Sequence, residues 1–144
     1  MIVVDTNVMV QLVAAGDEYV AAVRLYRRDS AWSAPPILMS ELRNVLVGLV
    51  RRGEITENQA KAMTDDASAI LGDRVAAVSG RQTIAAALEC GLTAYDAEFV
   101  VLARGLRVPL ATLDRAILSG APDVAVSPAI LAARLEGSGP ERFR

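Results

Sequence analysis

Short apolar segments alternate with helix-like patterns along nearly the whole chain, and this alternation predicts an α/β protein with a mainly parallel sheet covered by helices on both faces. Of the 144 residues, 53% are hydrophobic and only 4% are aromatic. Such a composition suits aliphatic side chains packed between helices and a compact sheet. The length is enough for one domain with its own core, which we expect over residues 1–133, followed by a polar, flexible tail over residues 134–144.

The expected strands are short apolar runs with charged residues, prolines or glycines at their ends. The first run, IVV, has no polar residue, which is typical of a buried central strand. Two prolines, Pro35 and Pro36, end the second run. The expected strands are residues 2–4, 31–35, 74–78, 108–112 and 124–126.

Between these runs, apolar residues recur at helical spacing. In the segment 37–52 they form one face, which consists of Leu38, Leu42, Val45, Leu46 and Leu49. Thr56 and Gln59 form a capping box that opens the next helix. The expected helices are about two turns from residue 6, then residues 17–28, 37–52, 56–71, 80–90, 93–106 and 115–118.

The net charge of −2 does not favour a broad nucleic-acid-binding surface. The cations are nearly all arginine, and Lys61 is the only lysine. Because the guanidinium group matches phosphate geometry, a local phosphate-binding rim remains open. The N-terminus, MIVVDTN, lacks the pattern of a signal peptide, and no apolar stretch reaches the roughly 18 residues of a membrane span. We therefore expect a soluble cytoplasmic protein with no membrane partner.

The numbers of cysteine and histidine residues limit the kinds of catalytic and metal site that the chain can form. The only cysteine, Cys90, cannot form an internal disulfide, and its AAALEC context is more typical of a packed thiol than of a reactive one. The chain has no histidine. This absence excludes a Ser-His-Asp triad and histidine-ligated zinc. Any metal must be held by oxygen, which favours Mg²⁺ or Mn²⁺.

Acidic residues occupy the positions that matter most in such a fold. Asp5, Asp96 and Asp114 each follow an apolar run. In an open α/β sheet these positions converge on the crevice at the carboxyl ends of the strands, where ligands bind. Glu41 lies on the flank of the apolar face of segment 37–52, on the same edge as Asn44. Four carboxylates in one crevice repel each other unless cations hold them, so the pattern indicates a metal site.

A structural interpretation stands beside this one. Asp5 and Asp114 precede expected helices and are good N-cap residues. Asp96 lies in an expected first turn, where a negative charge complements the helix dipole. Glu41, taken alone, is equally consistent with a solvated side chain.

The four acidic residues lie in the segments VVDTNV, SELRNVL, TAYDAEFVVLA and LATLDRAI. The order and spacing of these segments resemble the PIN-domain family, and especially its VapC-type toxin ribonucleases, over about residues 1–130. The resemblance implies a three-layer α/β/α sandwich with a central, mainly parallel sheet of four or five strands. It also implies hydrolysis of RNA with one or two Mg²⁺ or Mn²⁺ ions, a cognate antitoxin protein and a homodimer.

The resemblance assigns roles residue by residue. From its place at the end of a central strand we expect Asp5 to be the central metal ligand, and we expect Glu41 to position or deprotonate the attacking water. The implied catalytic and metal-binding residues are Asp5, Glu41, Asp96 and Asp114. The residues expected to hold these carboxylates in place are Thr6, Asn7 and Thr112. The candidate RNA-binding residues are Arg43 and Arg115. Helices 37–52 and 56–71 are candidate contact surfaces for the antitoxin.

Two other functions remain open. A Mg²⁺-dependent aspartyl phosphotransferase or phosphatase would also place an aspartate after the first strand. Such phosphatases need a second aspartate two residues later, where this chain has Asn7, and a late lysine, whereas Lys61 lies in a mid-chain helix. A non-catalytic PIN-like interaction module would use the acids only as caps and bind a partner through its exposed helices.

Overall fold

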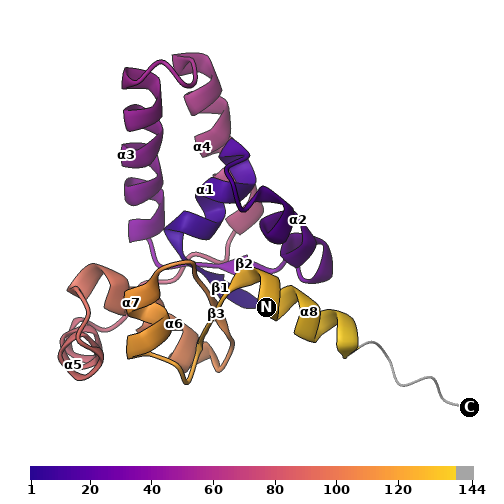
Figure 1. Ribbon diagram of the computed structural model, residues 1–144. Coiled ribbons are helices and arrows are strands. Elements are labelled where there is room, and N and C mark those ends of the chain that lie inside the picture. Colours follow the sequence, from indigo (N-terminus) through magenta and orange to yellow (C-terminus); the bar gives the residue numbers. More distant parts are fainter. Residues whose placement is uncertain (139–144) are drawn as a thin grey trace, which may run out of the picture.

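A four-stranded parallel sheet forms the centre of the computed structural model, which describes residues 1–138 (Figure 1). The strand order is β2-β1-β3-β4, and each neighbouring pair is parallel. The strands are β1 (Ile2–Val4), β2 (Trp32–Ser33), β3 (Leu110–Ala111) and β4 (Ala125–Val126). All three residues of β1 are buried, as expected for a central strand of uninterrupted apolar sequence.

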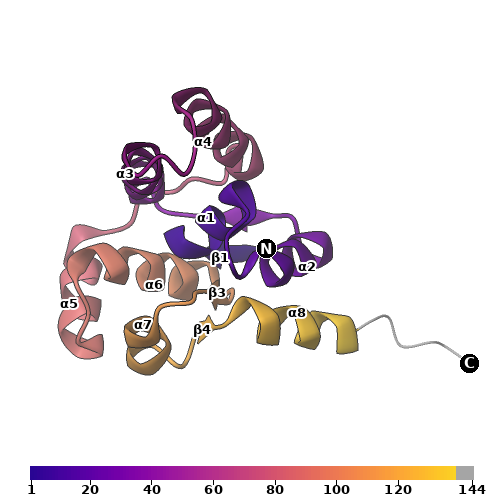
Figure 2. The same ribbon diagram turned by 45° about the horizontal axis from the view of Figure 1, so that its top comes forward.

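Helices cover both faces of this sheet, which confirms the predicted α/β/α architecture (Figures 1 and 2). Helices α1, α3 and α4 lie on one side, and α5, α6 and α7 lie on the other. The helices are α1 (Thr6–Ala14), α2 (Tyr19–Arg28), α3 (Ile37–Arg51), α4 (Glu57–Leu71), α5 (Gly80–Cys90), α6 (Ala94–Leu106), α7 (Arg115–Gly120) and α8 (Pro128–Gly137). The capping box predicted for α4 is present, since Thr56 and Gln59 exchange hydrogen bonds of 2.8 and 3.1 Å.

The strand order creates a crevice between β1 and β3. The chain passes from β1 to β2 on one side, whereas β3 pairs with β1 on the other side. The direction of winding therefore reverses at β1, and ligands in open α/β sheets bind at the carboxyl ends of the strands at such a point. The N–H of Asp5 donates to the carbonyl of Ala111 at 2.9 Å, so Asp5 and Thr112 leave the sheet side by side.

The core lies between the sheet and its helices. Trp32 and Phe99 are its largest fully buried side chains. The predicted apolar face of α3 is buried at Leu38, Leu42 and Leu46. Val45 departs from the prediction because its side chain is 37% exposed.

The strand predicted over residues 74–78 does not form among the described residues. Val75 makes only an isolated parallel bridge with Ala34, through hydrogen bonds of 3.2 and 3.1 Å. Pro35 and Pro36 follow Ala34 directly and have no N–H to donate, so the ladder cannot continue past this bridge. The sheet therefore has the lower of the two strand numbers expected.

The helix α8 follows β4, where the sequence patterns above predict none. Ser127 caps it by accepting a hydrogen bond from the N–H of Ile130, and Pro128 occupies its first turn. The first residues of the predicted tail, 134–137, belong to this helix. Residues 139–144 lie outside the described part of the chain. No helix within residues 1–138 is long and apolar enough to cross a membrane.

Candidate active site

Asp5 is the buried centre of the site. Only 5% of its surface is exposed, because it follows β1 directly and enters the crevice between β1 and β3. Its Oδ1 accepts a hydrogen bond of 2.8 Å from the N–H of Thr6, and its Oδ2 accepts one of 2.6 Å from the hydroxyl of Thr112. Both oxygens of the carboxylate are therefore fixed in direction.

Thr112 connects Asp5 to the next acidic residue of the site. Thr112 is fully buried. Its Oγ1 donates to Asp5 and accepts a hydrogen bond of 3.0 Å from the N–H of Asp114. Asn7 holds the same loop, because its Oδ1 accepts a hydrogen bond of 3.3 Å from the N–H of Leu113. These two contacts tie the segment after β3 to the segment after β1.

Glu41 reaches the site from α3. The hydroxyl of Thr6 donates to Glu41 Oε1 at 2.8 Å, and this contact joins the start of α1 to α3. The carboxylate is half-buried. Its placement resolves the ambiguity left by the sequence, because a side chain bonded to Thr6 at the rim of the crevice is not a freely solvated one.

Asp96 and Asp114 complete the acidic set in different ways. Asp96 lies in the first turn of α6, but the cap of this helix is Thr93, whose hydroxyl accepts from the N–H of Asp96 at 3.1 Å. Asp114 does cap α7, since its Oδ1 accepts from the N–H groups of Ala116 and Ile117 at 2.8 and 3.2 Å. The cap engages Oδ1 alone, and Oδ2 makes no hydrogen bond with the described residues.

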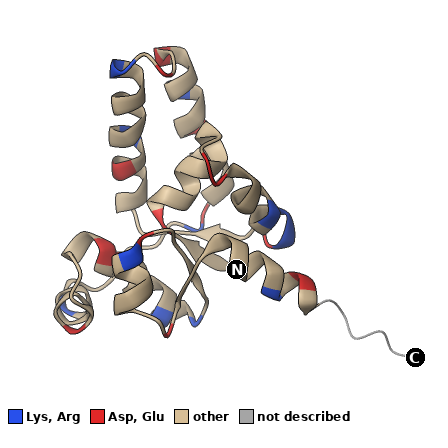
Figure 3. Ribbon diagram, in the orientation of Figure 1, with Lys and Arg blue, Asp and Glu red and all other residues tan. Residues whose placement is uncertain are grey.

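All four carboxylates line one pocket of about 390 Å³. The residues that line it are Asp5, Thr6, Asn7, Val10, Gln11, Glu41, Asn44, Val45, Asp96 and Asp114. Arg43 and Arg115 are not among them. Arg43 turns toward α4, where its Nε donates to Thr64 Oγ1 at 3.3 Å, and Arg115 is exposed at the start of α7. Figure 3 shows that basic residues are spread over several helices, among them the ends of α2 and α3 and the start of α7.

The pocket favours protons or cations. Burial raises the pKa of Asp5 from 3.8 to about 6, against the hydrogen bonds from Thr112 and Thr6, and the charges of Asp96 and Glu41 raise it further. Burial also raises the pKa of Glu41, to which the charges of Asp96 and Glu98 contribute. Burial and the charge of Asp114 raise the pKa of Asp96. No lysine or arginine lines the pocket to neutralise these carboxylates.

The donor set suits a hard cation. The pocket offers carboxylate, hydroxyl and amide oxygens, and neither histidine nor cysteine lines it. Within residues 1–138, no three acidic, histidine or cysteine side chains lie close enough together to enclose a metal ion. This arrangement fits Mg²⁺ or Mn²⁺ better than zinc, because Mg²⁺ keeps several waters and needs only one or two carboxylates.

Sequence reasoning missed part of the pocket. Val10 and Gln11 line it one turn after Asn7 on α1. Their i+3 and i+4 spacing from Asn7 was a signal that could have found them. Glu98 does not line the pocket, yet its charge reaches Glu41.

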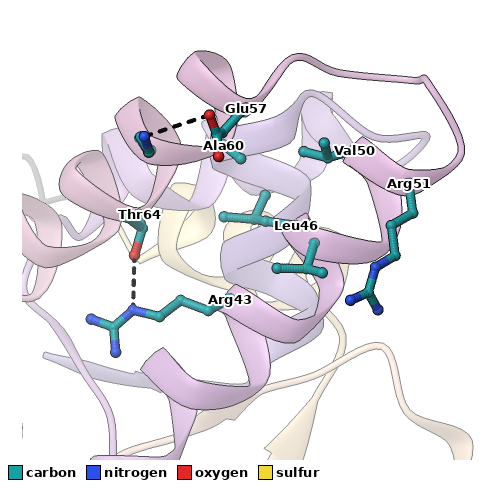
Figure 4. Close-up of a pocket in the computed structure, with 9 residues that line it drawn as sticks. Arg43, Leu46, Val50, Arg51, Glu57, Ala60 and Thr64 are labelled. Atoms are coloured by element: carbon teal, nitrogen blue, oxygen red, sulfur yellow. Dashed lines mark hydrogen bonds and ion pairs between the residues drawn. The ribbon is translucent and has the colours of Figure 1, made fainter.

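A second hollow of about 420 Å³ lies between α3 and α4 and contains none of the four acids (Figure 4). Its wall includes the apolar residues Leu46, Val50 and Ala60. Arg43 and Lys61 also line it. It offers apolar area and mainly positive charge, and Glu57 is the one carboxylate that lines it.

Comparisons with known proteins agree with this fold. Ribonuclease VapC1 of two strains of Mycobacterium tuberculosis is 32% identical over 112 residues, which are 78% of this chain and 84% of that protein. The crystal structure of PAE2754 from Pyrobaculum aerophilum superposes with a TM-score of 0.74 at 22% sequence identity, over 94% of this chain and 89% of that one. The profile of the PIN domain matches residues 2–121. The chain therefore belongs to the PIN-domain family.

Proposed function

We propose that this protein is a metal-dependent endoribonuclease, the toxin of a VapBC-type toxin–antitoxin pair, which hydrolyses RNA phosphodiester bonds. The observation that carries the proposal is the convergence of Asp5, Glu41, Asp96 and Asp114, from four distant segments, on one pocket at the switch point of the sheet. The similarity to Ribonuclease VapC1 supports RNA as the substrate. Such a substrate also supports action in the cytoplasm.

The proposed mechanism assigns the metal to Asp5, the one fully buried acid, together with Asp96 and Asp114, which would act directly or through water. Asp5, Asp96 and Asp114 would hold one or two Mg²⁺ or Mn²⁺ ions. A bound cation supplies the positive charge that lets an acidic pocket accept phosphate and that stabilises negative charge in the transition state. Thr112 and Asn7 keep Asp5 and the Asp114 segment in register through their hydrogen bonds.

Glu41 is the proposed base. Burial raises the pKa of Glu41, and a higher pKa makes its carboxylate a better acceptor of a proton from water. The hydroxyl of Thr6 holds one of its oxygens and leaves the other free to meet the attacking water.

The position of Lys61 favours hydrolysis of RNA over aspartyl phosphotransfer. The only lysine of the chain lines the hollow between α3 and α4, and its Nζ lies 3.7 Å from Glu57. It therefore cannot stabilise an acyl phosphate formed on Asp5.

The decisive experiment is incubation of the purified protein with total RNA in Mg²⁺, in Mn²⁺ or in chelator, followed by mapping of the cleaved ends. We expect cleavage with either ion, none in chelator, and none for Asp5→Asn with either ion. Cleavage that persists in Asp5→Asn would remove the assignment. Folded wild-type protein that cuts no RNA with either ion would favour a non-catalytic interaction module.

The hollow between α3 and α4 is the proposed contact surface for the antitoxin. Its apolar wall and the charges of Arg43 and Arg51 suit a partner segment with apolar and acidic residues. A homodimer is proposed through α5, whose Ile84 and Leu88 are 62% and 81% exposed. Light scattering of wild type and of Leu88→Glu tests the dimer, and only the wild type should have twice the monomer mass.

A further inference from the structure

Four residues of the carboxylate pocket have no part in the mechanism above. They are Val10 and Gln11 from α1 and Asn44 and Val45 from α3. Each pair lies three and four residues beyond a residue at the acidic end, Asn7 on α1 and Glu41 on α3, so each helix presents one continuous face. The pocket therefore extends about one helical turn, roughly 5.4 Å, past the acids. It is acidic at one end and neutral at the other.

The two amides at the neutral end have unused hydrogen-bonding groups. The Oε1 of Gln11 accepts a hydrogen bond of 2.8 Å from the N–H of Glu18. Gly16 leaves room for this contact, since a Cβ there would overlap the Gln11 amide. The amide is thus oriented, and its Nε2 has no partner among residues 1–138. Asn44 is exposed, and its side chain makes no hydrogen bond with the described residues.

The chemistry of this end matches a nucleobase. It has no lysine or arginine to bind a further phosphate. Asparagine and glutamine amides present donors and an acceptor in one plane, as the edges of bases do. Val10 and Val45 add apolar surface that suits the face of a base or a ribose. Single-stranded RNA is recognised through unstacked bases whose edges are read by such side chains.

We propose that Gln11 and Asn44 form a base-recognition subsite that selects the nucleotide next to the scissile phosphate. This inference rests on the proposed ribonuclease function and adds its sequence preference. A strand whose phosphate lies at the acids places a neighbouring base along α1 and α3. The substrate class is therefore single-stranded RNA with an unpaired base at the cut, and the two amides discriminate among the four bases.

The test measures the cleavage rates of short, single-stranded RNAs randomised at the two nucleotides on each side of the cut. The variants are Asn44→Ala and Gln11→Glu, of which the second keeps an acceptor for the Glu18 N–H and removes the amide donors. Asn58→Ala is the matched control, because Asn58 is an exposed asparagine of α4 outside the pocket. Circular dichroism and melting temperature establish that each variant is folded.

We expect wild type and Asn58→Ala to share one base preference at one position. In Asn44→Ala and in Gln11→Glu the ratio between the best and the worst base should fall about tenfold, the loss expected for one amide–base pair. An unchanged preference, or an equal loss of rate for all four bases, overturns the subsite and leaves the ribonuclease proposal intact. Absence of cleavage by the wild type overturns both.

Discussion

Replacing Asp5 by asparagine should make the metal-free protein more stable at neutral pH. Asp5 is buried, and its pKa is raised from 3.8 to about 6. Because the folded state holds the proton more tightly than the unfolded state, this carboxyl contributes its full stability only below pH 4. That contribution is lost as the pH rises to 6. A neutral asparagine of the same shape avoids the loss.

The pKa difference sets the size of the effect. With 1.36 kcal/mol for each pH unit between the two pKa values, the gain for Asp5→Asn is about 3 kcal/mol at pH 8 and about 0.5 kcal/mol at pH 4. For a chain of this length, the gain at pH 8 corresponds to a rise in melting temperature on the order of 5–10 °C. The hydroxyl of Thr112 can turn to accept from the asparagine amide, so its hydrogen bond need not be lost.

Urea denaturation of both proteins in chelator, at pH values from 4 to 8, measures this difference. The free energy of unfolding of Asp5→Asn should exceed that of the wild type by an amount that grows with pH. A pH-independent difference, or a variant less stable than wild type at pH 8, refutes the claim that an ionised Asp5 destabilises the empty site. It would also remove the main electrostatic reason to expect a cation there.

Three further results are expected. Millimolar Mg²⁺ or Mn²⁺ should raise the melting temperature of wild type and leave that of Asp5→Asn unchanged. At a metal concentration ten times the dissociation constant, binding adds about 1.4 kcal/mol to the free energy of unfolding. Thr112→Val removes the hydroxyl that orients Asp5, so RNA cleavage should fall about 10- to 100-fold, whereas Thr112→Ser should retain it. Gly120→Ala places a Cβ against the carbonyl oxygen of Cys90 and should cost about 1–3 kcal/mol in urea denaturation, while the exposed neighbour Ser119→Ala should cost little.

Local sequence patterns predicted most of the fold because local physics decides those elements. An unbroken apolar run makes β1, and the Thr56 capping box starts α4. The predictions fail where contacts between segments far apart in the sequence determine the structure. Residues 74–78 are apolar enough for a strand, but the prolines after Ala34 remove the donors that they need. The start of α8 has a local signal of its own, the N-cap Ser127 followed by Pro128.

For the site too, local patterns predict some residues, whereas contacts between distant segments determine others. The positions of Asp5 and Asp114 follow from strand ends, which the sequence marks. The direction of Arg43 does not, since it depends on α4 packing beside α3 and offering Thr64. The helical spacing of Gln11 from Asn7 places both on one side of α1, but only the packing of α1 against α3 brings Gln11 and Asn44 to the same pocket.

Capping and catalysis, which the sequence presents as alternatives for the aspartates, are compatible in the structure. Asp114 gives Oδ1 to the first N–H groups of α7, and this contact fixes the rotamer that directs the rest of the carboxylate. Asp5 likewise accepts from Thr6 while it lies at the centre of the pocket. A carboxylate has about four lone-pair sites, so the two hydrogen bonds that each of these aspartates accepts leave room for a cation. A helix N-terminus also partly offsets the repulsion among the acids. The caps are therefore part of what allows several carboxylates to share one crevice before any metal binds.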